Sequence, residues 1–181
     1  MATWKIDSAH SEVNFKVKHL VVSTVTGGFD KFDATIEASK EDFSDAKIKF
    51  EADINSINTK NEQRDGHLKS ADFFDAENNP KLVFESTSVK MTSDYEMLVK
   101  GNLTIRGITK EVKLDVIYNG IVTGFGNIKV AGFEIRGKVN RFDYGLQWNA
   151  LTEAGGVVVS NEVKIEILAE FNEAQSEIKA A

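Results

Sequence analysis

Apolar and polar residues alternate along most of the chain, which is the pattern of a β-strand with one buried and one solvated face. The clearest example is residues 46–55, where the apolar residues occupy every second position. Similar runs begin near residues 13, 32, 82, 97, 112, 128 and 163. The pattern predicts about eight strands, and the glycine-containing breaks between several of them favour antiparallel connections.

The stretch between the third and fourth predicted strands departs from this alternation. Thr59 is followed three residues later by Glu62, which is the spacing of a capping box, where both side chains bind the first free amides of a helix. We therefore expect a short helix that ends near Ser70. Leu68 on this helix and Phe73 just beyond it could then cover one opening of a barrel.

The chain has no internal repeat and no shift in composition that would mark a second domain. Its 181 residues, of which 41% are hydrophobic and 28% charged, suit one soluble domain with its own core. We therefore expect an all-β fold, with a single domain over residues 1–172 and a C-terminal tail over residues 173–181.

The charge pattern and the lack of certain residues exclude several classes of protein. The net charge is -6 with Lys and Glu interleaved, so the chain lacks the basic face expected for a nucleic-acid partner. There is no cysteine for a disulfide or a thiolate metal site. No apolar run approaches the roughly 18 residues that span a bilayer, and the first residues lack the apolar stretch of a signal peptide. We expect a cytoplasmic protein, or a periplasmic one if a leader was removed.

A search for catalytic motifs finds little. His10, His19 and His67 are too scattered for a paired metal motif, and no nucleophile elbow, phosphate-binding loop or dinucleotide fingerprint is present. The acidic residues lie mainly on strand faces that the alternation predicts to be solvated. These observations favour a protein that is not an enzyme and that uses no metal ion and no cofactor.

Glycines in one predicted strand leave two alternatives open. Gly101 and Gly107 share their parity with Leu103 and Ile105, so on an inward face they would remove side-chain volume from a barrel wall and favour a cavity. They could equally mark a bulge or a bend. The chain also has twelve Phe against three Tyr, which favours an interior suited to an aliphatic chain.

Four motifs occur in an order that is similar to one known family. They are the opening segment 4–29, the segment 64–80 with Arg-Asp-Gly-His-Leu followed by Asp-Phe-Phe-Asp and Pro80, the segment 101–110, and Arg-Phe-Asp-Tyr-Gly at 141–145. On these residues the chain resembles the YceI-like family of polyisoprenoid-binding, lipocalin-like proteins. The resemblance extends from Trp4 to Phe171.

This resemblance implies an eight-stranded antiparallel lipocalin-like barrel with a short helix between the third and fourth strands. It also implies an elongated apolar cavity that takes a long amphiphile, such as an isoprenoid quinone or a polyprenyl phosphate. Members are often dimeric, so a homodimer is an expectation. Many members are exported behind a leader, which is not visible in this sequence.

For such a ligand, inward strand parity suggests the residues of the wall. His19 and Arg64 are candidates for the polar head of the ligand. The alternative for His19 is a hydrogen-bonded histidine at a strand end, and for Arg64 a solvated helix face. The expected wall consists of Phe15, Val17, Phe32, Ile36, Phe50, Ile54, Phe84, Leu103 and Ile105, with Leu68 and Phe73 as a lid.

Three functions remain in competition. The leading hypothesis is non-enzymatic binding, transport or storage of a long-chain amphiphilic lipid. The second is an enzyme that acts on such a lipid at the barrel mouth, with His19 or His67 as its base. The third is a structural or stress-related protein whose barrel is solidly packed and binds no ligand.

Overall fold

The computed structural model describes residues 1–175. Within that range the α-helix is α1 (Glu62–Lys69), and short 3-10 turns lie at Ser8–His10, Ile54–Ser56, Phe125–Asn127 and Arg141–Tyr144. The strands are β1 (Ala2–Ile6), β2 (Glu12–His19), β3 (Ser23–Phe29), β4 (Phe32–Ala38), β5 (Lys47–Asp53), β6 (Ile57–Asn58), β7 (Lys81–Met91), β8 (Glu96–Ile105), β9 (Ile108–Thr123), β10 (Lys129–Asn140) and β11 (Val159–Glu173).

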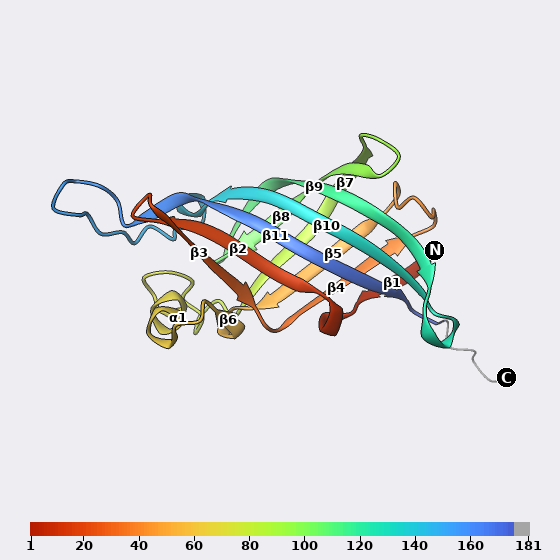
Figure 1. Cartoon of the computed structure of the whole chain (residues 1–181), viewed down its shortest axis with the longest axis horizontal. Helices are drawn as coiled ribbons and strands as arrows, with labels where there is room; N and C mark the ends of the chain where they lie inside the picture. Colours follow the sequence, from red (N-terminus) through yellow and green to blue (C-terminus); the bar gives the residue numbers. More distant parts are fainter. Residues whose placement is uncertain (176–181) are drawn as a thin grey trace.

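The strands form an elongated antiparallel barrel (Figure 1). The ring runs β1-β4-β5-β7-β8-β9-β10-β11, and it closes where β11 pairs with β1, with Ile6 opposite Phe171 and Trp4 opposite Glu173. The predicted all-β, eight-stranded antiparallel barrel with one short helix is therefore confirmed. Closure leaves this ring without a free edge.

The remaining segments, β2, β3 and β6, continue three of the ring strands beyond a break. β2 runs along β11 next to β1, β3 pairs with β2, and β6 pairs with β3. Asp7 and Asp53 begin two of the breaks, where each carboxylate accepts a hydrogen bond from a backbone N–H two residues on and so caps a 3-10 turn. Because of these breaks, the eight strands of the barrel appear as eleven segments, of which β1, β3 and β6 lie outside the predicted runs.

Helix α1 ends where the sequence predicts, but the predicted capping box is wrong. Asn61 is the N-cap, and its side-chain oxygen accepts a hydrogen bond of 2.9 Å from the Arg64 amide. Lys60 is left-handed with φ of 63°, which turns Thr59 away from the helix start. The Thr59 hydroxyl instead donates to Asp65 Oδ1 at 2.5 Å. An Asn next to the first helical residue is a stronger cap than a more distant Thr.

The structure favours a bend over missing volume at the two glycines. Gly107 lies with Arg106 in the tight turn between β8 and β9, where both residues have positive φ, so it is not a wall position. Gly101 lies opposite an irregularity in β7 between Ser86 and Ser88. A Cβ on Gly101 would overlap the ring of Phe84, so that ring already fills the space.

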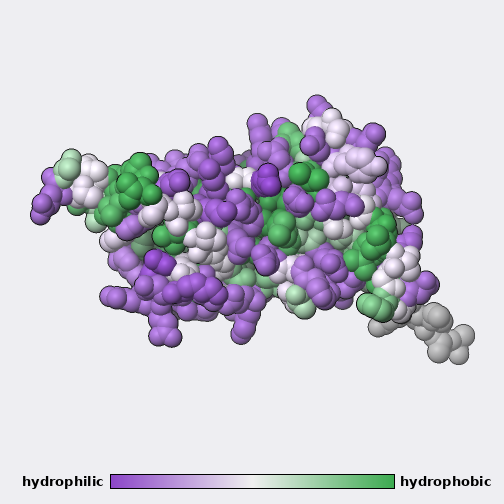
Figure 2. Space-filling view, viewed as in Figure 1, coloured by the Kyte–Doolittle hydropathy of each residue, from purple (hydrophilic) through white to green (hydrophobic). Residues whose placement is uncertain are grey.

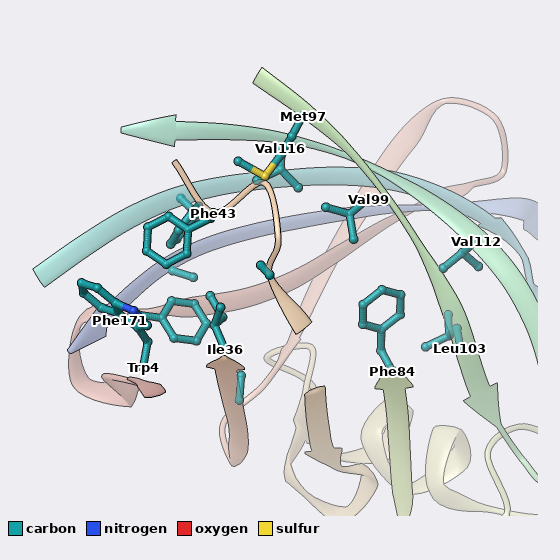
Figure 3. Packing of buried hydrophobic residues seen from close by; sticks show 14 of the residues in the cluster. Trp4, Ile36, Phe43, Phe84, Met97, Val99, Leu103, Val112, Val116 and Phe171 are labelled. Atoms are coloured by element: carbon teal, nitrogen blue, oxygen red, sulfur yellow. The ribbon is translucent and has the colours of Figure 1, made fainter. Parts of the chain in front are cut away.

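An aromatic cluster seals one end of the barrel. Phe43, from the loop between β4 and β5, is almost fully buried, and its ring centroid lies 5.2 Å from that of Trp4 and 5.1 Å from that of Phe133. Phe171 continues the cluster at 5.8 Å from Phe133. Figure 3 shows Phe43, Trp4 and Phe171 gathered at this end, with Phe84 and Leu103 further along the barrel. We call Trp4, Phe43, Phe133 and Phe171 the aromatic plug.

Apolar side chains are exposed at the other end of the barrel, on the β2–β3 hairpin and the β10–β11 loop (Figure 2). The two loops are joined by a hydrogen bond of 2.9 Å from the Leu20 amide to the Val158 carbonyl. We call Leu20, Val21, Val22, Leu151 and Val157 the apolar tip.

No helix within residues 1–175 has the length and apolar character needed to span a bilayer. Of the predicted tail, residue 173 ends β11, and the Ala174 amide donates to the Thr3 carbonyl at 2.8 Å. Residues 176–181 lie outside the described residues.

Candidate functional site

The barrel encloses a cavity of about 240 Å³. Its lining comes from inward-facing side chains of most of the strands and from α1 and the segment that follows it. Strand β11 illustrates the geometry, because every second residue from Val163 to Phe171 lines the cavity. Apart from Asn14, Arg141 and Tyr144, the lining residues are aliphatic or aromatic. The alternation seen in the sequence therefore becomes an apolar lumen.

Most of the residues predicted for the wall and the lid belong to this lining. Leu68 on α1 and Phe73 beyond it cover the lumen from the side of the helix. The predicted wall residues that line the cavity are Phe15, Val17, Ile36, Phe50, Phe84, Leu103 and Ile105.

Two predicted wall residues lie outside the cavity lining. Ile54 is buried, but it sits in the 3-10 turn that breaks the strand, where the two-residue alternation no longer applies. It packs in a second hydrophobic cluster together with Val13 and Phe29. Phe32, at the start of β4, packs against that same cluster, and its ring is stacked on that of Phe50 at 6.5 Å. Both residues therefore pack against residues that line the cavity.

The two residues predicted to bind the ligand head also lie outside the lining. His19 is at the end of β2, and its carbonyl accepts a hydrogen bond of 3.3 Å from the Ser23 hydroxyl. Arg64 is on the exposed side of α1, and its guanidinium donates to the Thr59 hydroxyl and to the Thr59 carbonyl, both at 2.7 Å. Arg64 therefore braces the start of the helix.

His67, the alternative catalytic base, packs against the lid. Its Nε2 is hydrogen-bonded to Asp72 Oδ2 at 2.9 Å. Its ring meets the rings of Phe73 and Trp148 edge-on, with centroids 5.0 and 4.7 Å away. These contacts fix α1 against the β10–β11 loop.

Arg141 is a cavity-lining residue that the sequence analysis did not assign to the site. It is 5% exposed, and its guanidinium donates to four backbone carbonyls, two in the β10–β11 loop and two at the start of β11. Among residues 1–175, no carboxylate lies within ion-pair distance of it. Burial lowers the pKa of Arg141. The acceptors are the carbonyls of Leu146 at 2.6 Å, Trp148 at 2.7 Å, Ser160 at 2.9 Å and Val159 at 3.3 Å.

Tyr144 is the second cavity-lining residue that was not foreseen. It is 1% exposed, and its hydroxyl finds no hydrogen-bond partner within the described part of the chain. Burial, with a smaller contribution from the charge of Asp143, raises the pKa of Tyr144 to about 12. The sequence marked both residues only as part of the 141–145 motif, because an Arg and a Tyr are ordinarily expected at or near the surface.

A separate polar group lies on the outside of the barrel, at the break between β1 and β2. Asp7, His10 and Glu170 bring their ligand atoms within 4.8 Å of one another. His10 Nδ1 is hydrogen-bonded to Asp7 Oδ2 at 3.0 Å. This hydrogen bond lowers the pKa of Asp7 and raises the pKa of His10. Asp7 and His10 form an ion pair at the surface. Glu170 on β11 is far away in the sequence, and only the folded barrel brings its carboxylate to this pair.

Comparisons with known proteins agree with this geometry. The model of a family described as the YceI-like domain matches residues 4–171. A UPF0312 protein of Staphylococcus aureus is 43% identical over 173 residues, which cover 95% of this chain and 98% of the relative.

Solved structures show the same barrel. The Campylobacter jejuni YCEI protein is 31% identical, with a TM-score of 0.75 over 93% of this chain and 96% of that one. A polyisoprenoid binding domain from Saccharophagus degradans is 16% identical, with a TM-score of 0.64 over 94% of this chain and 98% of that one. At that identity the second likeness concerns the fold alone.

Proposed function

The chain belongs to the YceI-like family, and from that premise we propose that it binds a long-chain amphiphilic lipid in its barrel. The ligand class is an isoprenoid quinone or a polyprenyl phosphate, and the protein carries or stores it without chemical change. The observation that carries this proposal is the cavity, whose lining is aliphatic and aromatic at all but three positions.

The physical basis of the binding is the removal of a hydrocarbon chain from water. Each Å² of apolar surface buried contributes about 25 cal/mol, and this contribution does not depend on the details of the chain. The volume of about 240 Å³ lies below the roughly 300–1,000 Å³ of usual ligand pockets. A lumen of this size suits one narrow chain, while a ring system would need the lid to move.

One protein of the same fold supports a lipid as the ligand. The Saccharophagus degradans domain that shares this fold is described as polyisoprenoid binding. Its interior and that of the present chain are built on the same barrel, so a tail of the same class is the natural occupant of the lumen.

The placement of titratable groups supports binding rather than catalysis. Among the lining residues of the described chain there is no histidine and no carboxylate. The candidate bases His19 and His67 lie outside the lining, and His67 is held by Asp72. The third hypothesis, a solidly packed barrel, is disfavoured by the cavity itself.

Native mass spectrometry of the protein purified from its own host tests this proposal. We expect a co-bound hydrophobic molecule whose mass identifies the lipid class. Delipidated protein should also take up an isoprenoid quinone or a polyprenol from detergent solution. A protein that arrives without ligand and takes up neither compound would contradict the proposal.

A pair of variants tests whether the lumen is the site. Val163 lines the cavity, whereas Lys164 next to it on β11 is exposed on the outer face. Val163→Phe should lower lipid uptake strongly while changing the melting temperature little, because the ring enters empty space. In a solid core the same change would destabilise the fold by about 1–3 kcal/mol. Lys164→Phe adds the same ring outside the barrel and should leave uptake unchanged.

A further inference from the structure

Phe43 blocks one end of the lumen. It comes from the loop between β4 and β5, and it lines the cavity although it is only 1% exposed. Its ring centroid lies 5.2 Å from that of Trp4, 5.3 Å from that of Tyr118 and 5.1 Å from that of Phe133. Trp4 and Tyr118 do not line the cavity. The Phe43 ring therefore separates these two rings from the lumen.

The burial of the lining residues changes along the barrel. On β11 the lining residues Val163, Ile165 and Ile167 are half-buried, whereas Ala169 and Phe171 are buried. The lining residues of β10 change in the same way. Side chains that point inward and are still partly accessible border empty space, while fully buried ones are packed against neighbours. The empty part of the lumen therefore ends at the aromatic plug, where Phe43 fills the barrel.

The loop that carries Phe43 is held in place by hydrogen bonds. The Asp45 carboxylate accepts from two amides at the start of the loop, at 3.0 and 3.2 Å. The Tyr118 hydroxyl on β9 donates to the Glu41 carbonyl at 3.0 Å. Phe43 itself has a φ of 57°, which is unusual for a bulky residue. The loop thus fixes the ring inside the barrel at the cost of backbone strain.

We propose that Phe43 is the floor of the lumen and that its ring sets the longest isoprenoid tail that the protein accommodates. The inference rests on the proposed function and adds a limit on the length of the tail. Within the described part of the chain the cavity presents no polar surface, so the lumen distinguishes ligands by the length and shape of their tails. Each further isoprene unit strengthens binding only while there is room to bury it.

A purely structural role of Phe43 is the competing explanation. The removal of a large buried side chain lowers stability wherever that side chain lies in a core. A loss of stability alone therefore does not identify the floor. A change in the longest tail that still adds affinity does identify it, because a buried residue away from the lumen has no influence on that length.

The test compares Phe43→Ala with Ile54→Ala in the full chain. Ile54 is also 1% exposed, but it packs in the second hydrophobic cluster and does not line the cavity. The probes are geraniol, farnesol, geranylgeraniol and geranylfarnesol, each longer than the one before by one isoprene unit. The series continues by single units until the affinity of the wild type levels off. The measurements are the dissociation constant of each prenol and the melting temperature with and without it.

We expect the affinity of the wild type to rise roughly tenfold or more with each buried isoprene unit and then to level off. Phe43→Ala should lower the melting temperature of the ligand-free protein and extend the rise by one unit. An engineered apolar cavity of about 150 Å³ stays dry and binds benzene, which is close in size to one isoprene unit. The longest prenol should also raise the melting temperature of Phe43→Ala more than that of the wild type, because it fills the new space.

Phe43→Leu keeps part of the apolar side chain and covers the case in which Phe43→Ala does not fold. It should shift the limit in the same direction, with a smaller gain in affinity for the first prenol beyond it. Ile54→Ala should lower the melting temperature and keep the limit of the wild type.

Two results would overturn the inference while leaving the lipid cavity in place. The first is a limit that is the same in the wild type and in the Phe43 variants that fold. The second is an equal shift of the limit in Ile54→Ala, which would indicate a general loosening of the barrel. If the wild type binds no prenol of the series and no other isoprenoid, the proposed function itself fails.

Discussion

Three glycines lie beneath side chains that line the cavity. A Cβ on Gly27 would overlap the ring of Phe15, one on Gly101 the ring of Phe84, and one on Gly137 the side chain of Leu114. Each glycine lets its neighbour lie flat against the wall. At the residue scale, the width of the lumen depends on glycines that leave room for neighbouring side chains, a role that alternation alone does not reveal.

Gly27→Ala tests this role. The added methyl group would meet the far end of the Phe15 ring and the Thr59 methyl group, so the ring should turn into the lumen. We expect the free energy of unfolding to fall by about 1–3 kcal/mol and lipid affinity to fall with it. Chemical denaturation and lipid titration measure the two effects.

Gly66→Ala is the matched control for that variant. Gly66 lies inside α1 with no atom within 4 Å of a Cβ, so alanine should raise the free energy of unfolding by about 0.5–1 kcal/mol through helix propensity. Lipid affinity should stay the same. If Gly27→Ala and Gly66→Ala lose lipid affinity equally, the loss does not come from a Phe15 ring that turns into the lumen.

The ion pair of His10 predicts a local pH response. The hydrogen bond to Asp7, followed by the charges of Asp7 and Glu170, raises the pKa of His10 above its usual value. Because the pKa of His10 is higher in the folded state, the ion pair contributes fully to stability below the unfolded-state pKa of about 6.5. That contribution is lost as the pH rises through the folded-state pKa.

An NMR titration of His10 checks this shift. Asp7→Asn retains a capping oxygen for the Ala9 amide but removes the charge, and it should bring the pKa of His10 back toward about 6.5. A titration of His10 that is the same in both proteins would contradict the assignment.

At the scale of elements, one residue fastens the longest loop to the barrel. The carbonyls of Leu146 and Trp148 in the β10–β11 loop and of Val159 and Ser160 at the start of β11 all accept hydrogen bonds from Arg141. In a regular sheet, N–H groups of a neighbouring strand would donate hydrogen bonds to these carbonyls. Here the guanidinium donates them instead. The loop is therefore positioned by the 3-10 turn that carries Arg141.

Arg141→Met should release this loop. Several carbonyls lose their donor at once, and a buried group left unpaired costs about 1–3 kcal/mol, so we expect the free energy of unfolding to fall by roughly 2–4 kcal/mol. Hydrogen exchange over residues 146–160 should become faster. Arg136→Met, on the exposed side of β10, serves as the control and should change stability by no more than about 0.5 kcal/mol.

The whole molecule has two different ends. The aromatic plug closes one end, and the apolar tip extends from the other. Val21 and Val22 in the tip are 75% and 86% exposed. Val21 also has a φ of 63°, which is strained for a β-branched residue. Exposed apolar residues and backbone strain often mark a surface that works in contact with another apolar phase.

We expect lipid exchange with vesicles to pass through the apolar tip. Val21→Asp combined with Val22→Asp should slow the transfer of an isoprenoid from vesicles to the protein several-fold. Stability should not fall, because Asp accepts a left-handed backbone better than Val. The capacity for lipid at equilibrium should remain that of the wild type.

The opposite end provides the control. Val122 and Phe125, at the β9–β10 turn, are also highly exposed, and Val122→Asp with Phe125→Asp should leave the transfer rate unchanged. Equal slowing by both pairs of substitutions would indicate a general effect of added charge.

The sequence by itself determined the all-β barrel class, the position of the short helix and most of the residues that line the cavity. Alternation is a local property, so residues such as Val17, Phe84 and Leu103 face inward wherever the strand is regular. The same rule misplaced Ile54, because a 3-10 turn shifts the phase of the side chains there. It also placed His19 at the lumen, which the strand end does not line.

Only the tertiary structure decided that Arg141 and Tyr144 are buried beside the cavity and how the barrel is closed. Phe43 reaches the aromatic plug from a loop, and Arg141 is buried because carbonyls from a distant part of the chain surround it. Tyr144 is left without a partner by the same packing. Burial and pairing are set by residues far apart in sequence, and no periodicity within one strand records them.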